Sequence, residues 1–452
     1  MKLPGHLIEA ISERLLPEKA SISFTGVYTD SRQPMENGLF VPIVGERFDG
    51  HNFIHSAIEK GANASLWQKD KPIPKNIPEN FYLYLVEDTL QALQQLSKAY
   101  LKFIDPIVVG VTGSNGKTTT KDLLDAVLST TYKTYKTQGN FNNHIGLPLT
   151  ILGMEHDCEL LILEMGMSGY GEIELLSNIA EPHFAVVTNI GESHIEQLGS
   201  REGIAKAKME ITKGLRRDGK VIIDGDEPLL HSFYSENVST CGFAHTCKSQ
   251  IMNISSTEFG YTFSINGEDT LFEVPLLGRH NIKNAAYAII IGRELGLTEE
   301  SIQSGLKQVS LTGMRLERLK GLNGSTIIND AYNASPTSMR AAIEAIKELP
   351  GFSKRILILG DMYELGPDES ALHKSVASVI DKPITHLFTV GEKGQWILDA
   401  FNEKKDHTLI VQRFLNKEDI VETALKLLDE NTVVLIKASR GLQLETITKH
   451  LM

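Results

Sequence analysis

The sequence predicts a three-domain α/β protein: a small N-terminal α/β domain, a central parallel sheet with a mononucleotide-binding loop and an antiparallel ribbon, and a C-terminal Rossmann-like α/β domain. Three observations lead to this prediction. Short apolar β-runs alternate with helical patterns along the chain, which favours parallel sheets covered by helices. A glycine-rich turn followed by GKTTT separates one such run from a helical pattern. The later β-runs end in Gly, Asp or Asn, at the strand ends where open α/β sheets bind ligands.

The composition is that of a globular protein with several cores. The chain has 452 residues, of which 41% are hydrophobic and 23% charged, so two to four domains are expected. Its net charge of −12 argues against non-specific binding of nucleic acid. Cys158, Cys241 and Cys247 form no C-x-x-C pair, which argues against a disulfide framework or a zinc site.

The cellular location is predicted from two patterns that the sequence lacks, a membrane-spanning helix and a signal peptide. No run reaches the roughly 18 apolar residues of a spanning helix. Residues 1–16 have an amphipathic helix pattern in which Glu9 and Glu13 interrupt any apolar core, unlike a signal peptide. We therefore expect a cytoplasmic protein without a membrane span.

The first domain is expected to span residues 1–104, before the Asp105-Pro106 break. Its predicted strands are FTGVYT, LFVPIV and FYLYLV. The central domain, residues 105–312, has predicted parallel strands in IVVGVTG, LLILEMG, HFAVVTNIG and KVIIDGD. Residues 238–274 are rich in Ser, Thr, Gly and β-branched side chains, which predicts the antiparallel ribbon. The third domain, residues 313–452, has predicted strands in STIINDAY, RILILGDM, THLFTVG and TVVLIKASRG.

The turn after the first central strand predicts a site for nucleotide phosphates. Glycines allow backbone N–H groups to point at an anion, and the following helix adds its positive end. Lys117 has the place of the lysine that reaches the β- and γ-phosphates, and Thr118 that of the hydroxyl on Mg²⁺. Val111 replaces the first glycine of the usual pattern, so an ordinary glycine-rich strand–helix turn is the alternative. The predicted ATP contacts of this loop are Thr112, Gly113, Ser114, Asn115, Gly116, Lys117 and Thr118.

A triphosphate requires Mg²⁺, which prefers oxygen ligands. Glu164 follows the apolar run LLIL at the carboxyl end of a predicted strand, and His194 follows another strand in TNIGESHIEQLG. Both are candidate metal ligands. The alternatives are a helix cap or a solvated side chain for the glutamate and a structural role for the histidine.

Lys208 is the unusual residue of the helical segment REGIAKAKMEIT. Lys206 shares a face with Glu202 and Glu210, as expected for a solvated surface. Lys208 instead shares the apolar face with Ile204 and Ile211, where a free ammonium group is costly to bury. One solution is a carbamate, which is negative and offers two oxygens to a metal ion. The alternative is a lysine that extends its amine to solvent.

These residues resemble the Mur ligases, ATP-dependent amino-acid and peptide ligases of cell-wall precursor synthesis. The resemblance rests on TGSNGKTTT, the Glu164 strand end, His194 and AKAKMEI, and it covers essentially the whole chain. TDSRQPMENGLFVPIVGERFDGHNFI, GNFNNHIGLPLTIL, NDAYNASPTSM and LGDMYELG most resemble the family member that joins UDP-N-acetylmuramoyl-tripeptide to D-alanyl-D-alanine. No DNPR motif of the ligase that adds the third residue is present. Ala438, where glycine is more usual, is a small departure.

The resemblance implies a role for each matching residue. Lys117, Glu164, His194 and a carbamylated Lys208 would form the catalytic centre. Thr118 would bind one Mg²⁺, Glu164 would be a metal ligand, and His194 and Lys208 would hold a second Mg²⁺. The nucleotide would further contact His280, Asn281, Arg315 and Asp330. The first domain would bind the UDP-sugar, and its candidates are Ser31, Arg32, Asp49 and His51. Candidates for the peptide substrates are Asn142, Asn143, Asn333, Ser335, Asp361 and Glu364.

The same residues have plainer interpretations. Asn333, Ser335 and Asp361 are typical helix caps, Asn142 and Asn143 suit a turn, and Arg32 could pair with a surface acid. The resemblance implies a monomer that activates a carboxylate with ATP through an acyl phosphate, in a pathway that supports cell shape and division. Another ligase of the same fold, including the one adding the third stem residue or a folylpolyglutamate synthetase, a nucleotide switch protein and a kinase are the alternatives.

Overall fold

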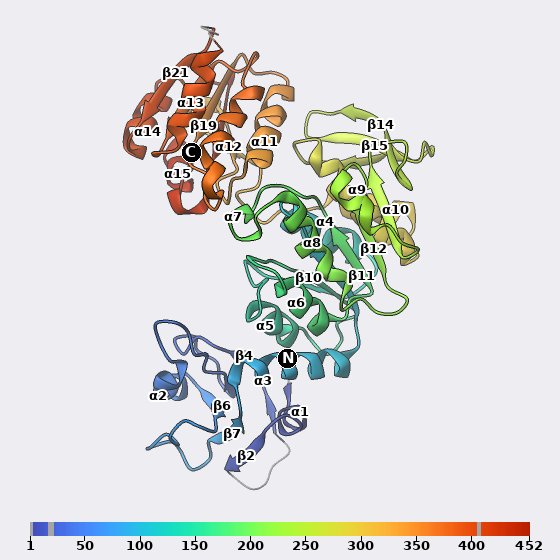
Figure 1. The fold of residues 1–452 in the computed structure, drawn as a ribbon, viewed down its shortest axis with the longest axis vertical. Helices are drawn as coiled ribbons and strands as arrows, with labels where there is room; N and C mark the ends of the chain where they lie inside the picture. The colour runs from blue at the N-terminus through green and yellow to red at the C-terminus, as the bar shows by residue number, and fades with distance from the viewer. Residues whose placement is uncertain (1–2, 17–21, 405–407) are drawn as a thin grey trace.

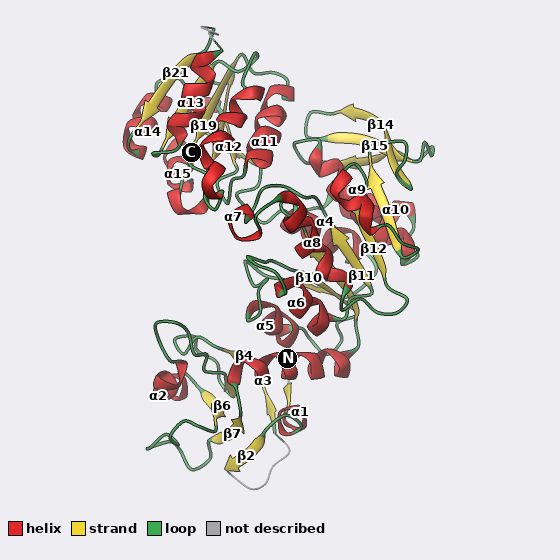
Figure 2. Cartoon of the chain, in the orientation of Figure 1, coloured by secondary structure: helices red, strands yellow, loops and turns green. Residues whose placement is uncertain are grey.

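The chain folds into three domains that follow one another along the molecule (Figures 1 and 2). The structure is a computed structural model that describes residues 3–16, 22–404 and 408–452. Blue, green and orange-red segments in Figure 1 mark the N-terminal, central and C-terminal domains, and each contains a β-sheet. Of the helices that the described residues form, none has both the length and the apolar character needed to cross a bilayer. The boundaries at residues 104 and 312 stay a prediction.

The N-terminal domain contains a five-stranded sheet in the order β2-β7-β6-β5-β4. Strand β6 was not predicted, because residues 64–67 are all buried and a strand covered on both faces lacks the alternating pattern. The elements are β1 (Leu3–Pro4), α1 (Gly5–Glu9), β2 (Glu13–Leu16), β3 (Ser23–Phe24), β4 (Val27–Tyr28), β5 (Gly38–Phe40), η1 (Gly50–Phe53), α2 (Ile54–Glu59), β6 (Ala62–Gln68) and β7 (Tyr82–Val86).

The amphipathic helix expected over residues 1–16 is confirmed only for Gly5–Glu9, since Leu3–Pro4 form β1 and residues 1–2 lie outside the described residues. Helix α1 ends at Glu9, and β2 follows as an antiparallel neighbour of β7, with Arg14 opposite Tyr84. Pairing with the edge of a sheet satisfies the backbone of this segment. Over so few residues, the periodic pattern did not distinguish these conformations.

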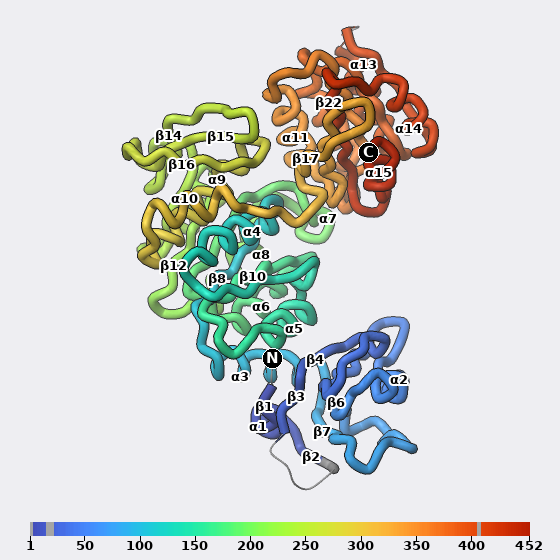
Figure 3. The backbone as a smooth tube through the Cα atoms, turned by 180° about the vertical axis from the view of Figure 1, so that it is seen from behind, coloured from blue at the N-terminus to red at the C-terminus, as the bar shows by residue number. Residues whose placement is uncertain are grey.

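Helix α3 (Thr89–Ile104) joins the first two domains. Asp88 caps its start by accepting the N–H of Gln91 at 2.8 Å. Leu96 and Tyr100 of α3 belong to the same apolar core as Leu147. Figures 1 and 3, which view the chain from opposite sides, both place α3 between the N-terminal domain and α5.

The central domain contains a nine-stranded sheet in the order β16-β15-β14-β13-β12-β11-β8-β10-β9. The elements are β8 (Ile107–Thr112), α4 (Lys117–Leu128), β9 (Thr134–Lys136), α5 (Gly146–Gly153), β10 (Leu160–Glu164), α6 (Glu172–Ala180), β11 (Phe184–Val187), α7 (Ile195–Leu198), α8 (Arg201–Met209), η2 (Glu210–Thr212), β12 (Lys220–Asp224), η3 (Pro228–Phe233), β13 (Val238–Gly242), β14 (Ser249–Ser256), β15 (Tyr261–Ile265), β16 (Phe272–Val274), α9 (His280–Glu294) and α10 (Glu299–Lys307).

Apolar side chains of the parallel strands alternate between two cores. Val108 packs in one core with α5 and α6, whereas Val109 packs in the other with α4 and α9. Strands β9 to β13 and β8 run parallel, so their carboxyl ends meet at one edge, where Thr112 and Glu164 are the last strand residues. The predicted ribbon is shorter than expected: β13 is parallel to β12, and only β14, β15 and β16 are antiparallel neighbours.

The C-terminal domain has a six-stranded sheet in the order β17-β18-β22-β19-β20-β21, in which only the β17–β18 pair is antiparallel. Its Rossmann-like character confirms the predicted fold class. The elements are β17 (Glu317–Lys320), η4 (Leu322–Gly324), β18 (Thr326–Asn329), α11 (Pro336–Glu348), β19 (Lys354–Leu359), η5 (Gly366–Asp368), α12 (Glu369–Ser375), η6 (Val376–Val379), β20 (His386–Val390), α13 (Gly394–Glu403), β21 (Ile410–Phe414), α14 (Lys417–Leu425), β22 (Thr432–Lys437), η7 (Arg440–Leu442) and α15 (Glu445–Leu451).

Candidate active site

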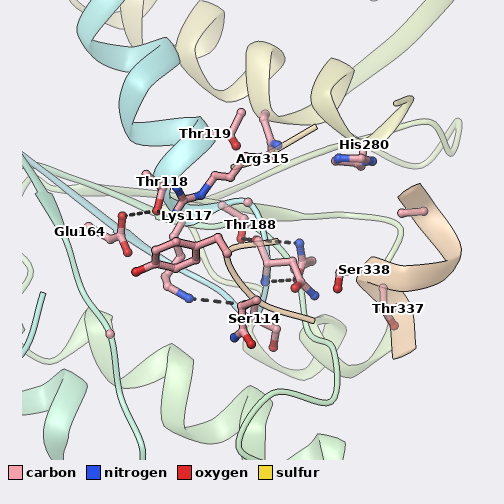
Figure 4. A pocket seen from close by; sticks show the side chains of 18 of the residues that line it. Ser114, Lys117, Thr118, Thr119, Glu164, Thr188, His280, Arg315, Thr337 and Ser338 are labelled. Atoms are coloured by element: carbon pink, nitrogen blue, oxygen red, sulfur yellow. Dashed lines mark hydrogen bonds between the residues drawn. The ribbon is translucent and has the colours of Figure 1, made fainter. Parts of the chain in front are cut away.

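A cavity of about 600 Å³ opens where the carboxyl edge of the central sheet faces the C-terminal domain. We call it the interdomain cavity. Residues on its walls include Lys117, Thr118, Glu164, His194 and Lys208 from the central domain and Arg315, Asp330 and Asn333 from the C-terminal segment. In Figure 4, Glu164 and Arg315 approach Thr118, while His280, Thr337 and Ser338 lie across the cavity from Glu164.

The phosphate loop needs glycine at two positions because neighbouring side chains lie against its backbone. Gly113 has φ 147° and Gly116 has φ 81°, values that favour glycine. A Cβ on Gly113 would lie 1.8 Å from Thr188 Oγ1, and one on Gly116 would lie 2.9 Å from Asn284 Oδ1. The loop is fastened to the end of β11, since Asn189 Oδ1 accepts the N–H of Asn115 at 3.0 Å.

Lys117 is held by the loop that it follows. Its Nζ donates a hydrogen bond to the carbonyl of Gly113 at 2.7 Å. Burial lowers the pKa of Lys117, as does Arg315, whereas Glu164 raises it. In the same loop, Ser114 Oγ is a buried polar atom without a hydrogen-bond partner among the described residues. A bound anion would supply the partners that this cluster of donors lacks.

Thr118 and Glu164 form the oxygen-rich side of the cavity. The Thr118 hydroxyl donates to Glu164 Oε2 at 2.7 Å, and Asn142 Nδ2 donates to Glu164 Oε1 at 2.9 Å. Arg315 Nη2 donates to Thr118 Oγ1 at 3.0 Å and its guanidinium lies 4.1 Å from the ring centre of Tyr332. Arg315 thus extends from the C-terminal segment to the phosphate loop.

Lys208 lies in the same cavity with its side chain buried. The residue is 2% exposed, and burial followed by the nearby Lys117 ammonium lowers its pKa well below the ordinary value. No carboxylate of the described residues offsets this lowering. Lys208 therefore lies on the buried face, as its spacing indicated, and the alternative of an amine extended to solvent is wrong. Lys206 is exposed as expected. Glu210, however, does not pair with Lys206, because its carboxylate accepts the N–H groups of Gly171 and Glu174.

His194 is held between two domains. Its Nδ1 lies 2.7 Å from Glu364 Oε2 of the C-terminal domain, although the two atoms lack hydrogen-bond geometry. Burial lowers the pKa of His194, with smaller effects from Lys117 and Lys208, and these outweigh Glu364, which raises it. Among the described residues, no three His, Cys, Asp or Glu side chains are grouped as a metal site. A cation here would depend on Thr118 and on Lys208 as well.

His280, Asn281 and Asp330 lie on the cavity wall, whereas the predicted Thr112 and Gly113 are not among its lining residues. Asn281 Nδ2 donates to Leu277 O at 2.7 Å, and His280, the first residue of α9, is exposed at the wall. The Asp330 carboxylate accepts from Lys437 Nζ at 2.6 Å. Lys437 was not among the predicted residues. Its position at the end of the apolar run TVVLI could have indicated it, because ligands bind at the carboxyl ends of such strands.

The four candidates of the first domain are not on the wall of the interdomain cavity. Arg32 forms an exposed ion pair with Asp30 at 2.7 Å, the plainer role that the sequence left open. Asp49 Oδ1 lies 2.6 Å from His51 Nδ1. Ser31 is buried and its carbonyl accepts the Ser56 hydroxyl at 3.3 Å. Binding of a UDP-sugar by these residues stays a prediction.

The predicted peptide contacts divide into two groups. Asn142, Asn143 and Asn333 line the cavity; Asn143 also accepts two N–H groups at the start of α5. Ser335, Asp361 and Glu364 are not among the lining residues. Ser335 is the N-cap of α11, as the alternative interpretation had it.

Asp361 supports the C-terminal domain in a way that can be tested. Its Oδ1 accepts the N–H groups of Lys393 and Gly394, at 2.9 and 2.8 Å. Replacing Asp361 with Ala should lower the free energy of unfolding by about 2 kcal/mol, because a capping carboxylate is lost. Calorimetric unfolding would measure this change, with exposed Asp368→Ala as the control. Unchanged stability with a raised KM for an amine substrate would instead assign Asp361 to binding.

Family models match all three domains. The model described as Mur ligase family, catalytic domain, matches residues 23–101, the Mur ligase middle domain matches 111–292, and the Mur ligase glutamate ligase domain matches 314–440. A UDP-N-acetylmuramoyl-tripeptide–D-alanyl-D-alanine ligase of Bacillus subtilis is 49% identical over 440 residues, which are 96% of this chain and 95% of the relative. The chain belongs to the Mur ligase family. This Mur ligase is therefore an ATP-dependent enzyme that forms an amide bond.

Other relatives agree over the same length. The ligase of that name from Escherichia coli is 32% identical over 96% of this Mur ligase and 94% of its own chain. The crystal structure of MurF from Acinetobacter baumannii superposes with a TM-score of 0.88 at 26% identity, covering 100% of this chain and 99% of that one. MurF from Thermotoga maritima in complex with ADP has a TM-score of 0.82 at 30% identity, covering 94% and 96%.

Proposed function

We propose that this Mur ligase joins UDP-N-acetylmuramoyl-tripeptide to D-alanyl-D-alanine in the cytoplasm, as a monomer, to make the precursor of peptidoglycan. One observation carries the proposal: the interdomain cavity places the phosphate loop and the acid Glu164 opposite Arg315 and Asn333 of the C-terminal segment. Such a cavity can hold a triphosphate beside a second, carboxylate-bearing substrate. Relatives that bear the name of this activity match 96% of the chain.

The reaction has two steps. In the first, a carboxylate oxygen of the tripeptide attacks the γ-phosphorus of ATP, the bond to the β,γ-bridging oxygen breaks, and ADP leaves. In the second, the neutral amine of D-alanyl-D-alanine attacks the acyl carbon, the bond to the phosphate oxygen breaks, and the nitrogen loses a proton. The products are an amide, ADP and phosphate.

Residues of the chain overcome the repulsion between a carboxylate and a triphosphate. Lys117 and Arg315 bring two positive charges to the phosphate loop, and the N-terminus of α4 adds its partial charge. Closing the C-terminal domain over the loop excludes water from the acyl phosphate. Asn142 and Asn143 on the cavity wall would orient the peptide end of the sugar substrate, while Ser31, Arg32, Asp49 and His51 would bind its UDP-sugar part.

The oxygen-bearing side chains in the interdomain cavity are suitable ligands for Mg²⁺. Thr118 and Glu164 bring two oxygen atoms within 2.7 Å of each other, and such hard oxygen ligands are those that Mg²⁺ prefers. When bound, Mg²⁺ neutralises phosphate charge and orients the transferred group. Thr118 and Glu164 would hold one ion, and His194 and Lys208 a second.

Lys208 would bind the second Mg²⁺ in the form of a carbamate. Its amine would attack the carbon of CO₂, an N–C bond would form, and a proton would be lost. The buried side chain would then carry a negative charge instead of an uncompensated positive one, close to Lys117. A buried ammonium without a partner is unfavourable, whereas the negative carbamate would lie close to the Lys117 ammonium and to a bound cation, both of which attract it.

The proposed substrates can be tested by reconstitution. In a mixture of enzyme, ATP, Mg²⁺, UDP-N-acetylmuramoyl-tripeptide and D-alanyl-D-alanine, we expect phosphate release that requires both substrates, and a product heavier than the tripeptide by one dipeptide less water. Mass spectrometry and a phosphate assay measure these results. Faster turnover of the UDP-muramoyl-dipeptide with a diamino acid would assign the chain to the neighbouring ligase. Phosphate release without an amide would favour a switch protein, and a phosphorylated end product a kinase.

A further inference from the structure

Glu192 links the central domain to the C-terminal domain beside the active site. It lies in the loop after β11 and is 8% exposed. Its Oε2 accepts the N–H of Thr337 at 3.1 Å, and its Oε1 accepts the Thr337 hydroxyl at 2.8 Å. Arg340 Nη2 lies 3.5 Å from the same Oε1. Both partners belong to α11, so a single carboxylate of one domain receives three donors from the other.

Helix α11 begins with a capping box formed by Ser335 and Ser338, which leaves one N–H of its first turn for this acceptor. The first N–H groups of an α-helix have no acceptor within the helix. Pro336 has no N–H, and the Ser335 hydroxyl accepts the N–H of Ser338 at 3.3 Å. The remaining group of that turn, the N–H of Thr337, finds its acceptor in Glu192. The positive end of the helix and the Arg340 guanidinium both attract the carboxylate.

The same turn of α11 is a wall of the interdomain cavity. Thr337 and Ser338 line it (Figure 4), and the Ser335 hydroxyl lies 3.4 Å from Asn115 Oδ1 of the phosphate loop. The separation between this turn and the loop therefore sets the width of the cavity. Gly191, next to Glu192, also packs on the loop, since a Cβ there would lie 3.1 Å from Asn115 Nδ2.

We propose that Glu192 is a positioning residue that holds the first turn of α11 against the phosphate loop and so sustains nucleotide affinity. ATP contacts walls from both domains only when they are closed together. A nucleotide that binds only the closed arrangement has an apparent Kd equal to its intrinsic Kd divided by the closed fraction. Glu192 raises that fraction. The role does not depend on which amine the ligase uses.

Two variants from opposite domains test the proposal in the full chain. Glu192→Gln keeps the shape of the side chain but removes the charge, and Arg340→Met removes a donor on the other side. Each should raise the Kd for an unhydrolysable ATP analogue by about 5- to 30-fold, as expected for the loss of charge-assisted hydrogen bonds. The double variant should bind the analogue little more weakly than Glu192→Gln alone, because Arg340 contacts the central domain here through the Glu192 carboxylate. Glu300→Gln, at an exposed position of α10, should leave the Kd unchanged.

A distance measurement separates positioning from a general structural role. Spin labels on cysteines introduced at exposed Lys206 and Lys374 would report the separation of the two domains. Without nucleotide, Glu192→Gln should shift the distances to longer values, and saturating analogue should restore those of the parent chain. Unchanged Kd and distances in both variants would overturn the proposal. So would a lower kcat with an unchanged Kd, which would mean that Glu192 acts through neighbouring His194. If Glu192→Gln does not fold, Arg340→Met alone decides.

Discussion

Replacing Lys208 with Ala should lower kcat by about 10²- to 10³-fold while the enzyme keeps its fold. Lys208 lies in the interdomain cavity with Glu164 and is 2% exposed. As a carbamate it would supply a metal ligand that no neighbouring acid can replace, since the described acids and histidines form no group of three there. Loss of one preorganised charge in an active site commonly costs 10² to 10³ in kcat. Steady-state phosphate release measures the effect.

The carbamate itself needs separate evidence. Enzyme prepared without CO₂ and bicarbonate should lose activity and regain it when ¹³C-bicarbonate is added, with a new ¹³C carbonyl resonance that is absent from Lys208→Ala. Lys206→Ala is the matched control, because this lysine lies on the exposed face of the same helix and should keep full activity and the resonance. Full activity of Lys208→Ala, or activity unaffected by bicarbonate, would contradict the modification.

The parts of the site that could be predicted are those encoded by neighbouring residues. Gly113, Gly116 and Lys117 specify the phosphate loop because a strand, two positive-φ positions and a helix start follow each other directly. Helical periodicity placed Lys208 on the apolar face of its helix, since residues three and four apart share one face, but it did not distinguish a buried amine from one extended to solvent. Buried apolar runs predicted most strands of the two large sheets for the same local reason.

Contacts between distant segments could not be predicted. Asp361 caps α13 and Glu364 faces His194. The sequence indicated a capping role for Asp361, but neither the distant helix that it caps nor the histidine that Glu364 faces. Glu192 finds its partners some 145 positions along the chain. Nothing in the local pattern distinguishes such acids from solvated ones, because their environment depends on how the domains meet. Strand β6 was also missed, because its burial on both faces depends on the packing of the domain and removes the alternating pattern that would have indicated a strand.

Lys117→Ala should have an effect as large as that of Lys208→Ala, for a simpler electrostatic reason. Lys117 Nζ is fixed by the carbonyl of Gly113 at the loop that receives the triphosphate. A unit charge about 4 Å from another contributes about 4 kcal/mol at an effective dielectric constant near 20, which corresponds to about 10³ in rate. We therefore expect kcat/KM for ATP to fall by about 10³-fold.

The step that fails in Lys117→Ala can be identified with hydroxylamine, which converts an acyl phosphate to a hydroxamate. The parent enzyme with ATP and UDP-N-acetylmuramoyl-tripeptide, but without the amine, should yield hydroxamate, whereas Lys117→Ala should yield almost none. Exposed Lys213→Ala controls for the loss of one positive charge and should behave like the parent. If Lys117→Ala forms hydroxamate at the parent rate but makes little amide, the lysine acts in the second step. The positive charge would then stabilise the departing phosphate rather than the approach of the carboxylate.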